Sequence, residues 1–183
     1  MQFLTDFADQ AVVLPLAACL IAWAWATGWR RGARAAALAL AATFGAVLLL
    51  KMALARCDPA AGLRSPSGHT AAAALVYGGG AALLLRRPWP QAALLAALAA
   101  FVIAASRLAL QVHSVADVLT GAAIGVSGAV LLIALAGPRP RGARLWPLGA
   151  AALGCAVLLH GQHAGLEAVL RHLAFGLFHR KGC

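Results

Sequence analysis

The chain has 183 residues, of which 63% are hydrophobic and only 11% are charged. A soluble domain needs more charge than this to cover its surface, so the composition excludes a soluble protein and favours a single membrane domain over residues 1–183. The net charge of +10 would suggest a nucleic-acid partner in a soluble chain. Here Lys and Arg lie between apolar blocks, which indicates membrane topology and no nucleic acid.

The apolar blocks are each close to the ~20 residues that cross a bilayer. They predict an all-α integral membrane bundle of about six transmembrane helices, at about 11–27, 35–55, 69–85, 91–110, 115–136 and 145–160. After Gly161, leucines and valines recur at helical spacing. This predicts a C-terminal amphipathic helix, which either lies at the membrane interface or packs on the bundle.

Basic residues lie in alternate connections between these segments. They are Arg30, Arg31 and Arg34, then Arg86 and Arg87, then Arg139, Arg141 and Arg144. The positive-inside rule assigns these connections to the cytoplasm. The N-terminus, MQFLTDFADQ, has no basic region, so no cleaved signal peptide is expected. We expect a bacterial inner-membrane protein; only the C-terminal HRK, which six spans place outside, runs against this trend.

Polar side chains gather at the predicted outer ends of the second to fifth segments. They are Lys51, Ser67, His69, Ser106, Arg107, His113 and Asp117. Charged groups at such depths are costly and usually functional. Because the second and fourth connections face the same side, the helix count alone brings these residues to one face of the membrane, the periplasmic or outer face.

His113 and Asp117 are four residues apart, so on a helix they share a face. A carboxylate beside an imidazole fixes its tautomer and raises its basicity, as in an activated histidine nucleophile or base. A helix-stabilising pair is the alternative interpretation.

The sequence Pro66-Ser67-Gly68-His69 begins a helix. Ser67 is either a plain N-cap or, with the backbone N–H of Gly68, part of a phosphate site at the helix N-terminus. His69 could then protonate a leaving oxygen, while Lys51, Arg107 and Arg64 hold the anion. The set suits phosphoryl transfer through phosphohistidine. The spacing of zinc ligands is absent, so neither a metal nor another cofactor is predicted.

These residues resemble the membrane lipid phosphatases of the type 2 phosphatidic acid phosphatase (PAP2) family. The family's second motif is present as Pro66-Ser67-Gly68-His69, and its third as SRLALQVHSVAD, which contains Ser106, Arg107, His113 and Asp117. The resemblance covers about residues 51–126. The first motif is degraded in KMALARCDP, where Lys51 and Pro59 stand in place but Asp58 replaces the expected Arg. Arg56 or Arg64 could supply this charge, the site could tolerate its loss, or the chemistry could have drifted.

The resemblance implies a six-helix bundle and a hydrolysis that needs no metal. It implies that His113 is the nucleophile, that Asp117 orients it, and that His69 is the general acid. The phosphate-binding residues that it implies are Lys51, Ser67, Gly68, Arg107 and Ser106, with Arg64 as a further candidate.

Among the substrates of small bacterial members, we favour undecaprenyl diphosphate at the outer face of the inner membrane. Phosphatidylglycerol phosphate, phosphatidic acid and lipid A phosphates are the alternatives. Phosphotransfer to a second lipid and a non-catalytic scaffold or transporter also stay open, and Asp58 gives weight to the last. Two glycine patterns, Gly78-Gly79-Gly80 and Gly121 with Gly125, predict close contacts between helices.

Overall fold

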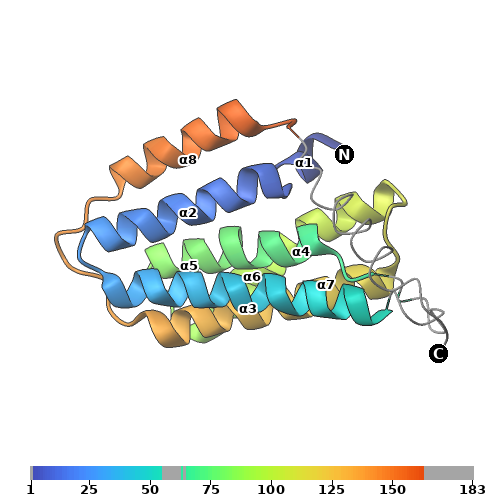
Figure 1. Cartoon of the computed structure of the whole chain (residues 1–183), viewed down its shortest axis with the longest axis horizontal. Helices are drawn as coiled ribbons and strands as arrows, with labels where there is room; N and C mark the ends of the chain where they lie inside the picture. Colours follow the sequence, from blue (N-terminus) through green and yellow to red (C-terminus); the bar gives the residue numbers. More distant parts are fainter. Residues whose placement is uncertain (1, 55–62, 64, 163–183) are drawn as a thin grey trace.

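A computed structural model describes residues 2–54, 63 and 65–162 of the chain. In these residues all the regular secondary structure is helical (Figure 1). The elements are α1 Gln2–Asp6, α2 Gln10–Ala26, α3 Arg30–Leu54, α4 Gly68–Ala72, the π-helix η1 Ala73–Gly79, α5 Gly80–Leu84, α6 Trp89–Ala109, α7 Val115–Ala136 and α8 Trp146–Leu159. The predicted all-α membrane bundle is confirmed. The predicted C-terminal amphipathic helix lies outside the described residues.

Within the described part of the chain, four stretches are long and apolar enough to cross a membrane, namely Gln2–Ala26 with its short break, α3, α6 and α7. Elements α4, η1 and α5 follow one another without a break in helical backbone and form a fifth rod over residues 68–84. The sixth, α8, has 14 residues. At 1.5 Å per residue it is about 21 Å long, which is shorter than the ~30 Å hydrocarbon core. It packs against α2 at one edge of the bundle (Figure 1).

The connection between the first two long helices is much shorter than predicted. It consists only of residues 27–29, because Gly28 adopts a φ of +77°, a left-handed conformation that reverses the chain tightly. Arg30, Arg31 and Arg34 therefore lie in the first turns of α3, and their placement in a loop was wrong. Helix α1 was not predicted as a separate element.

Glycines allow the central rod to approach its neighbours closely. A Cβ added at Gly78 would overlap the backbone of Ala96 on α6, and one at Gly125 on α7 would lie 2.5 Å from the carbonyl oxygen of Ala71. The predicted close contacts are confirmed at these positions. Gly80 is different, since an added Cβ there meets nothing within 4 Å.

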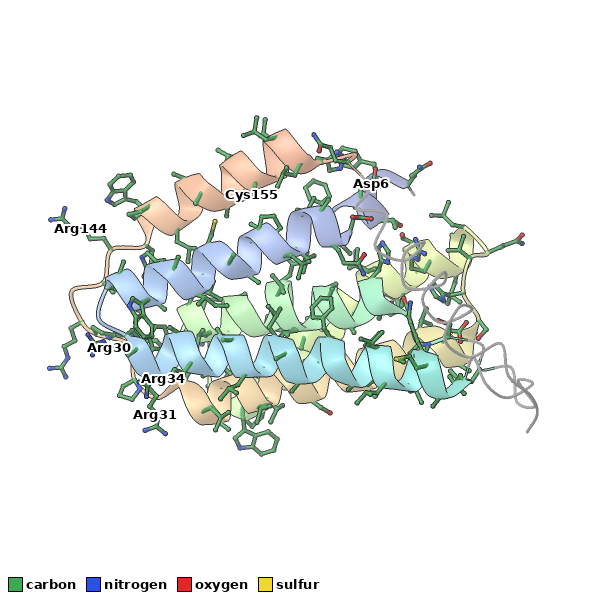
Figure 2. The ribbon with its side chains drawn as sticks, in the orientation of Figure 1. Asp6, Arg30, Arg31, Arg34, Arg144 and Cys155 are labelled. Atoms are coloured by element: carbon green, nitrogen blue, oxygen red, sulfur yellow. The ribbon has the colours of Figure 1, made fainter. Side chains whose placement is uncertain are left out.

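The two ends of the bundle differ in charge. Figure 2 shows the labelled Arg30, Arg31, Arg34 and Arg144 at one end and Asp6 at the other. The arginines of the three predicted cytoplasmic connections are thus at the same end of the molecule. Those predicted site residues that the structure describes lie at the opposite end.

Candidate functional site

Four helix ends meet at the end of the bundle remote from the arginines. Lys51 is in the last turn of α3, and Arg107 is in the last turn of α6. His69 and Asp117 are in the first turns of α4 and α7. Helix α4 packs against α3, α6 and α7, so the fold brings together these four helix ends and the three sequence motifs that they carry.

Asp117 forms a capping box at the start of α7. The Ser114 side chain accepts a hydrogen bond from the Asp117 N–H (3.2 Å), and Asp117 Oδ2 accepts one from the Ser114 N–H (3.0 Å). His113 is the residue just before this N-cap, and its Nδ1 is 3.5 Å from Asp117 Oδ2. The two residues therefore meet across the cap and not on one face of a helix, as their spacing had suggested.

The same aspartate also holds the segment that leads into α4. Its Oδ1 accepts a hydrogen bond from the Ser65 N–H (2.9 Å), and its backbone carbonyl accepts one from the Ser67 N–H (2.9 Å). Asp117 is 2% exposed. It thus joins the motif that carries His113 to the motif that carries His69, with both carboxylate oxygens in use.

Ser67 is the N-cap of α4 and is fully buried. Its hydroxyl oxygen accepts hydrogen bonds from the N–H (3.4 Å) and the hydroxyl (2.9 Å) of Thr70. The N-cap interpretation of this serine is therefore correct, and its contact with phosphate stays a prediction. Gly68 opens the helix directly after it, where the backbone N–H groups of the first turn have no partner within the helix.

Sequence reasoning missed Asp9. Its Oδ2 lies 3.6 Å from His69 Nε2, and both side chains are about nine-tenths buried. Asp9 is the N-cap of α2, where its Oδ1 accepts a hydrogen bond from the Ala11 N–H (2.8 Å). Its position before an apolar run was the available signal, but that signal indicates a helix start and not a histidine partner.

The N-terminal helix also contacts Ser106, a predicted phosphate-binding residue. The hydroxyl groups of Ser106 and Thr5 share a hydrogen bond, and Ser106 is 1% exposed. The Tyr77 hydroxyl donates a hydrogen bond to the Phe7 carbonyl (2.5 Å). Residues 2–9 are thus attached to α6 and η1 beside the site.

The predictions for Arg56, Asp58 and Arg64 lie outside the described residues. Among the residues that are described, no three His, Cys, Asp or Glu side chains gather in the manner of a metal site.

The geometry suits nucleophilic catalysis by histidine. A proton on His113 Nδ1, facing the Asp117 carboxylate, leaves the lone pair on Nε2, which is the nitrogen that would attack. A second histidine with its own carboxylate, His69 with Asp9, suits proton transfer to or from a leaving oxygen.

Comparison with known proteins supports this assignment. The family model for the PAP2 superfamily matches residues 57–141, a little under half of the chain. This match includes both complete motifs and starts after Lys51. Neither a curated protein nor a solved structure matches the chain significantly. The family match and the two complete motifs within it show that residues 57–141 belong to the PAP2 superfamily, and the helical membrane bundle agrees with this.

Proposed function

We propose that this PAP2-type phosphatase hydrolyses a lipid phosphate or diphosphate through a phosphohistidine. The observation that carries the proposal is the double role of Asp117. One carboxylate contacts the ring of His113 and also holds the backbone that leads to His69. Two histidines, one just before α7 and one in the first turn of α4, are thereby held in a fixed relation, as a two-step phosphoryl transfer requires.

In the first step, His113 Nε2 attacks phosphorus. An N–P bond forms while the bond from phosphorus to the leaving oxygen breaks, and His69 gives its proton to that oxygen. Asp117 stabilises the charge that develops on the attacking ring. The Asp9 carboxylate beside His69 favours the protonated imidazole that this step consumes.

In the second step, water attacks the phosphorus of the phosphohistidine. The N–P bond breaks, His69 takes a proton from the water, and inorganic phosphate leaves. Lys51, Arg107 and the N–H groups at the start of α4, including that of Gly68, bind the phosphate oxygens throughout. Cations and a helix N-terminus are the groups that stabilise a phosphoryl oxygen.

The surface around His113 supports a lipid substrate. Val112, Val115 and Leu119 are 52%, 59% and 64% exposed, and they surround the His113–Asp117 pair along the chain. On α3, Leu49 is 69% exposed and lies two residues before Lys51. Apolar side chains that lie open beside a polar site suit a substrate whose chain stays in the bilayer while its phosphate enters the site.

We propose undecaprenyl diphosphate as the substrate, acted on at the outer face of a bacterial inner membrane without a metal ion. The arginines gathered at the opposite end support this orientation, because cytoplasmic ends of membrane helices carry the excess of Lys and Arg. Undecaprenyl diphosphate is one of the substrates on which small bacterial members of the family act.

Phosphate release by the purified protein in detergent with EDTA tests the proposal. The substrates are undecaprenyl diphosphate, phosphatidylglycerol phosphate, phosphatidic acid and a lipid A phosphate. We expect release that continues in EDTA, is fastest with undecaprenyl diphosphate, and is abolished by His113→Ala. Release that needs a metal, or that survives this substitution, would contradict the mechanism.

Samples quenched in base give a second readout. A phosphohistidine is labile in acid and stable in base, so labelled substrate should leave base-stable label on the wild type. His113→Ala should retain none. Replacing Asp117 with Asn should lower the rate of labelling. A phosphorylated product that forms only when a second lipid is added would identify phosphotransfer instead of hydrolysis.

A further inference from the structure

At the end of the bundle opposite the site, a cavity of about 370 Å³ opens between the end of α5 and the segment after α7. Four arginines line it, namely Arg86, Arg87, Arg139 and Arg141, together with the buried Trp29. None of these residues takes part in the proposed hydrolysis. The function of this basic cavity is therefore a separate question.

The arginines of the cavity are close to one another. Arg86 Nη2 donates a hydrogen bond to the Arg139 carbonyl (3.2 Å), and Arg139 Nη1 donates one to the Leu84 carbonyl (3.1 Å). The Nε atom of Arg139 is buried and has no hydrogen-bond acceptor among the described residues. Burial, and then the positive charge of Arg86, lower the pKa of Arg139 from its usual value.

The described part of the chain supplies no carboxylate to balance this charge. Its acidic residues are Asp6, Asp9 and Asp117, and all three belong to the other end of the bundle (Figure 2). Like charges near one another are unfavourable unless a counter-ion joins them. An anion with several oxygens would supply both the missing charge and an acceptor for Arg139 Nε.

The backbone conformation of Arg86 also supports a binding role for this cavity. The N–H groups of Arg86 and Arg87 bond to the carbonyls of Leu83 and Ala82, which is a Schellman ending of α5. Glycine is the usual residue at the position of Arg86, whose φ is +57°. Arginine is disfavoured in this conformation, and a residue kept in such a conformation suggests that its side chain has a function.

The neighbours of the cavity favour a lipid over a dissolved anion. Leu85 and Trp89 are 60% and 61% exposed on either side of Arg86 and Arg87. Exposed tryptophan beside arginine is typical of the membrane–water interface, at the depth of lipid head groups. Acyl chains could therefore lie along the apolar surface while the phosphodiester enters the cavity.

We infer that this basic cavity binds the phosphodiester head group of an anionic phospholipid in the leaflet opposite the catalytic site. Basic pockets between membrane helices bind such head groups. The inference does not depend on the proposed hydrolysis. Topology alone accounts for arginines at this end, but not for a buried Arg139 Nε atom that has no acceptor among the described residues, beside a cavity that four arginines line.

Binding of phosphatidylserine to the purified protein in nonionic detergent tests the inference. Native mass spectrometry and the shift in thermal unfolding midpoint measure it, with phosphatidylcholine and inorganic phosphate as competing probes. For the wild type we expect phosphatidylserine to bind at least about tenfold more tightly than phosphatidylcholine. Each arginine near anionic lipid contributes about fivefold, so Arg86→Gln/Arg139→Gln should weaken binding by roughly 30-fold.

The matched control is Arg34→Gln/Arg144→Gln, which removes two exposed arginines from the same end but outside the cavity. It should bind phosphatidylserine like the wild type. Because Arg139 also bonds to the end of α5, Arg87→Gln/Arg141→Gln provides a second cavity variant, again with a loss of binding expected. Equal losses in cavity and control variants, an absence of preference over phosphatidylcholine, or displacement by millimolar inorganic phosphate would each overturn the inference.

Discussion

Replacement of Gly121 by alanine should lower the rate of phosphate release far more than it lowers stability. Gly121 lies on α7, against the N-cap of α4. A Cβ at this position would lie 3.2 Å from both the backbone C and N of Ser67, and closer still to its carbonyl oxygen. Carbon–oxygen contacts settle at about 3.3–3.6 Å, so the start of α4 must move away from α7 by on the order of 1 Å.

The size of the effect follows from this displacement. The start of α4 carries His69 and is bonded to Asp117, which contacts His113. A misplacement of about 1 Å between catalytic groups can lower a rate by about 100-fold. Overpacking costs about 1–3 kcal/mol. Alanine in place of glycine inside a helix stabilises the fold by about 1 kcal/mol, so the net loss of stability is about 0–2 kcal/mol.

The assay compares initial rates of phosphate release and unfolding midpoints for the wild type, Gly121→Ala and a matched glycine variant in one detergent. The control is Gly45→Ala on α3, because an added Cβ there meets nothing within 4 Å. It should keep the wild-type rate and a midpoint at or slightly above that of the wild type. Wild-type turnover in Gly121→Ala, or an equal loss in the control, would refute the reasoning.

Three further predictions concern the site and the packing of the last helix. Asp9→Asn keeps an N-cap but removes the charge beside His69, so kcat should fall about 10-fold or more with little change in KM. The loss should shrink with a p-nitrophenyl leaving group, which needs no general acid, and a loss independent of the leaving group would refute the role of Asp9. Asp9→Ala should in addition lower the unfolding midpoint, because it also removes the N-cap. Asp117→Asn should lower kcat by about 10²–10⁴-fold, because the amide has one accepting oxygen where the carboxylate uses two. Wild-type turnover would contradict this prediction. The Sγ atoms of Cys19 and Cys155 are 4.0 Å apart, so mild catalysed oxidation should join them in a disulfide. The test uses a variant in which the other two cysteines are replaced by serine, and it measures the loss of free thiols. Thiols that persist would contradict the packing of α8 on α2.

The sequence predicted those helices best whose ends carry local signals. Helix α7 has the predicted bounds, because Ser114 caps its start and Gly137, with a φ of +64°, follows its end. The start of α3 was predicted five residues late. Arg30, Arg31 and Arg34 suggested a loop, whereas the tight turn at Gly28 lets the helix begin among them.

The candidate site was predictable where helix count and motif spacing determine it. Four helix ends at the same side of a bundle bring Lys51, His69, Arg107 and Asp117 together, as expected. The pair of Asp9 with His69 was not predictable in this way, because 60 residues separate them and Asp9 also satisfies the local pattern of an N-cap. Contacts between distant segments leave no periodic signal in the sequence.

The capping box of α7 explains how so short a motif can set up a nucleophile. A helix start needs acceptors for its first N–H groups, and Ser114 and Asp117 supply them to each other. The carboxylate that this cap fixes in place is the same one that faces His113 and bonds to Ser65. Local helix energetics therefore orient the proposed catalytic pair before substrate arrives. For this reason a substitution at Asp117 should affect α7, the approach to α4 and the nucleophile together, whereas one at Asp9 should affect only His69 and the start of α2.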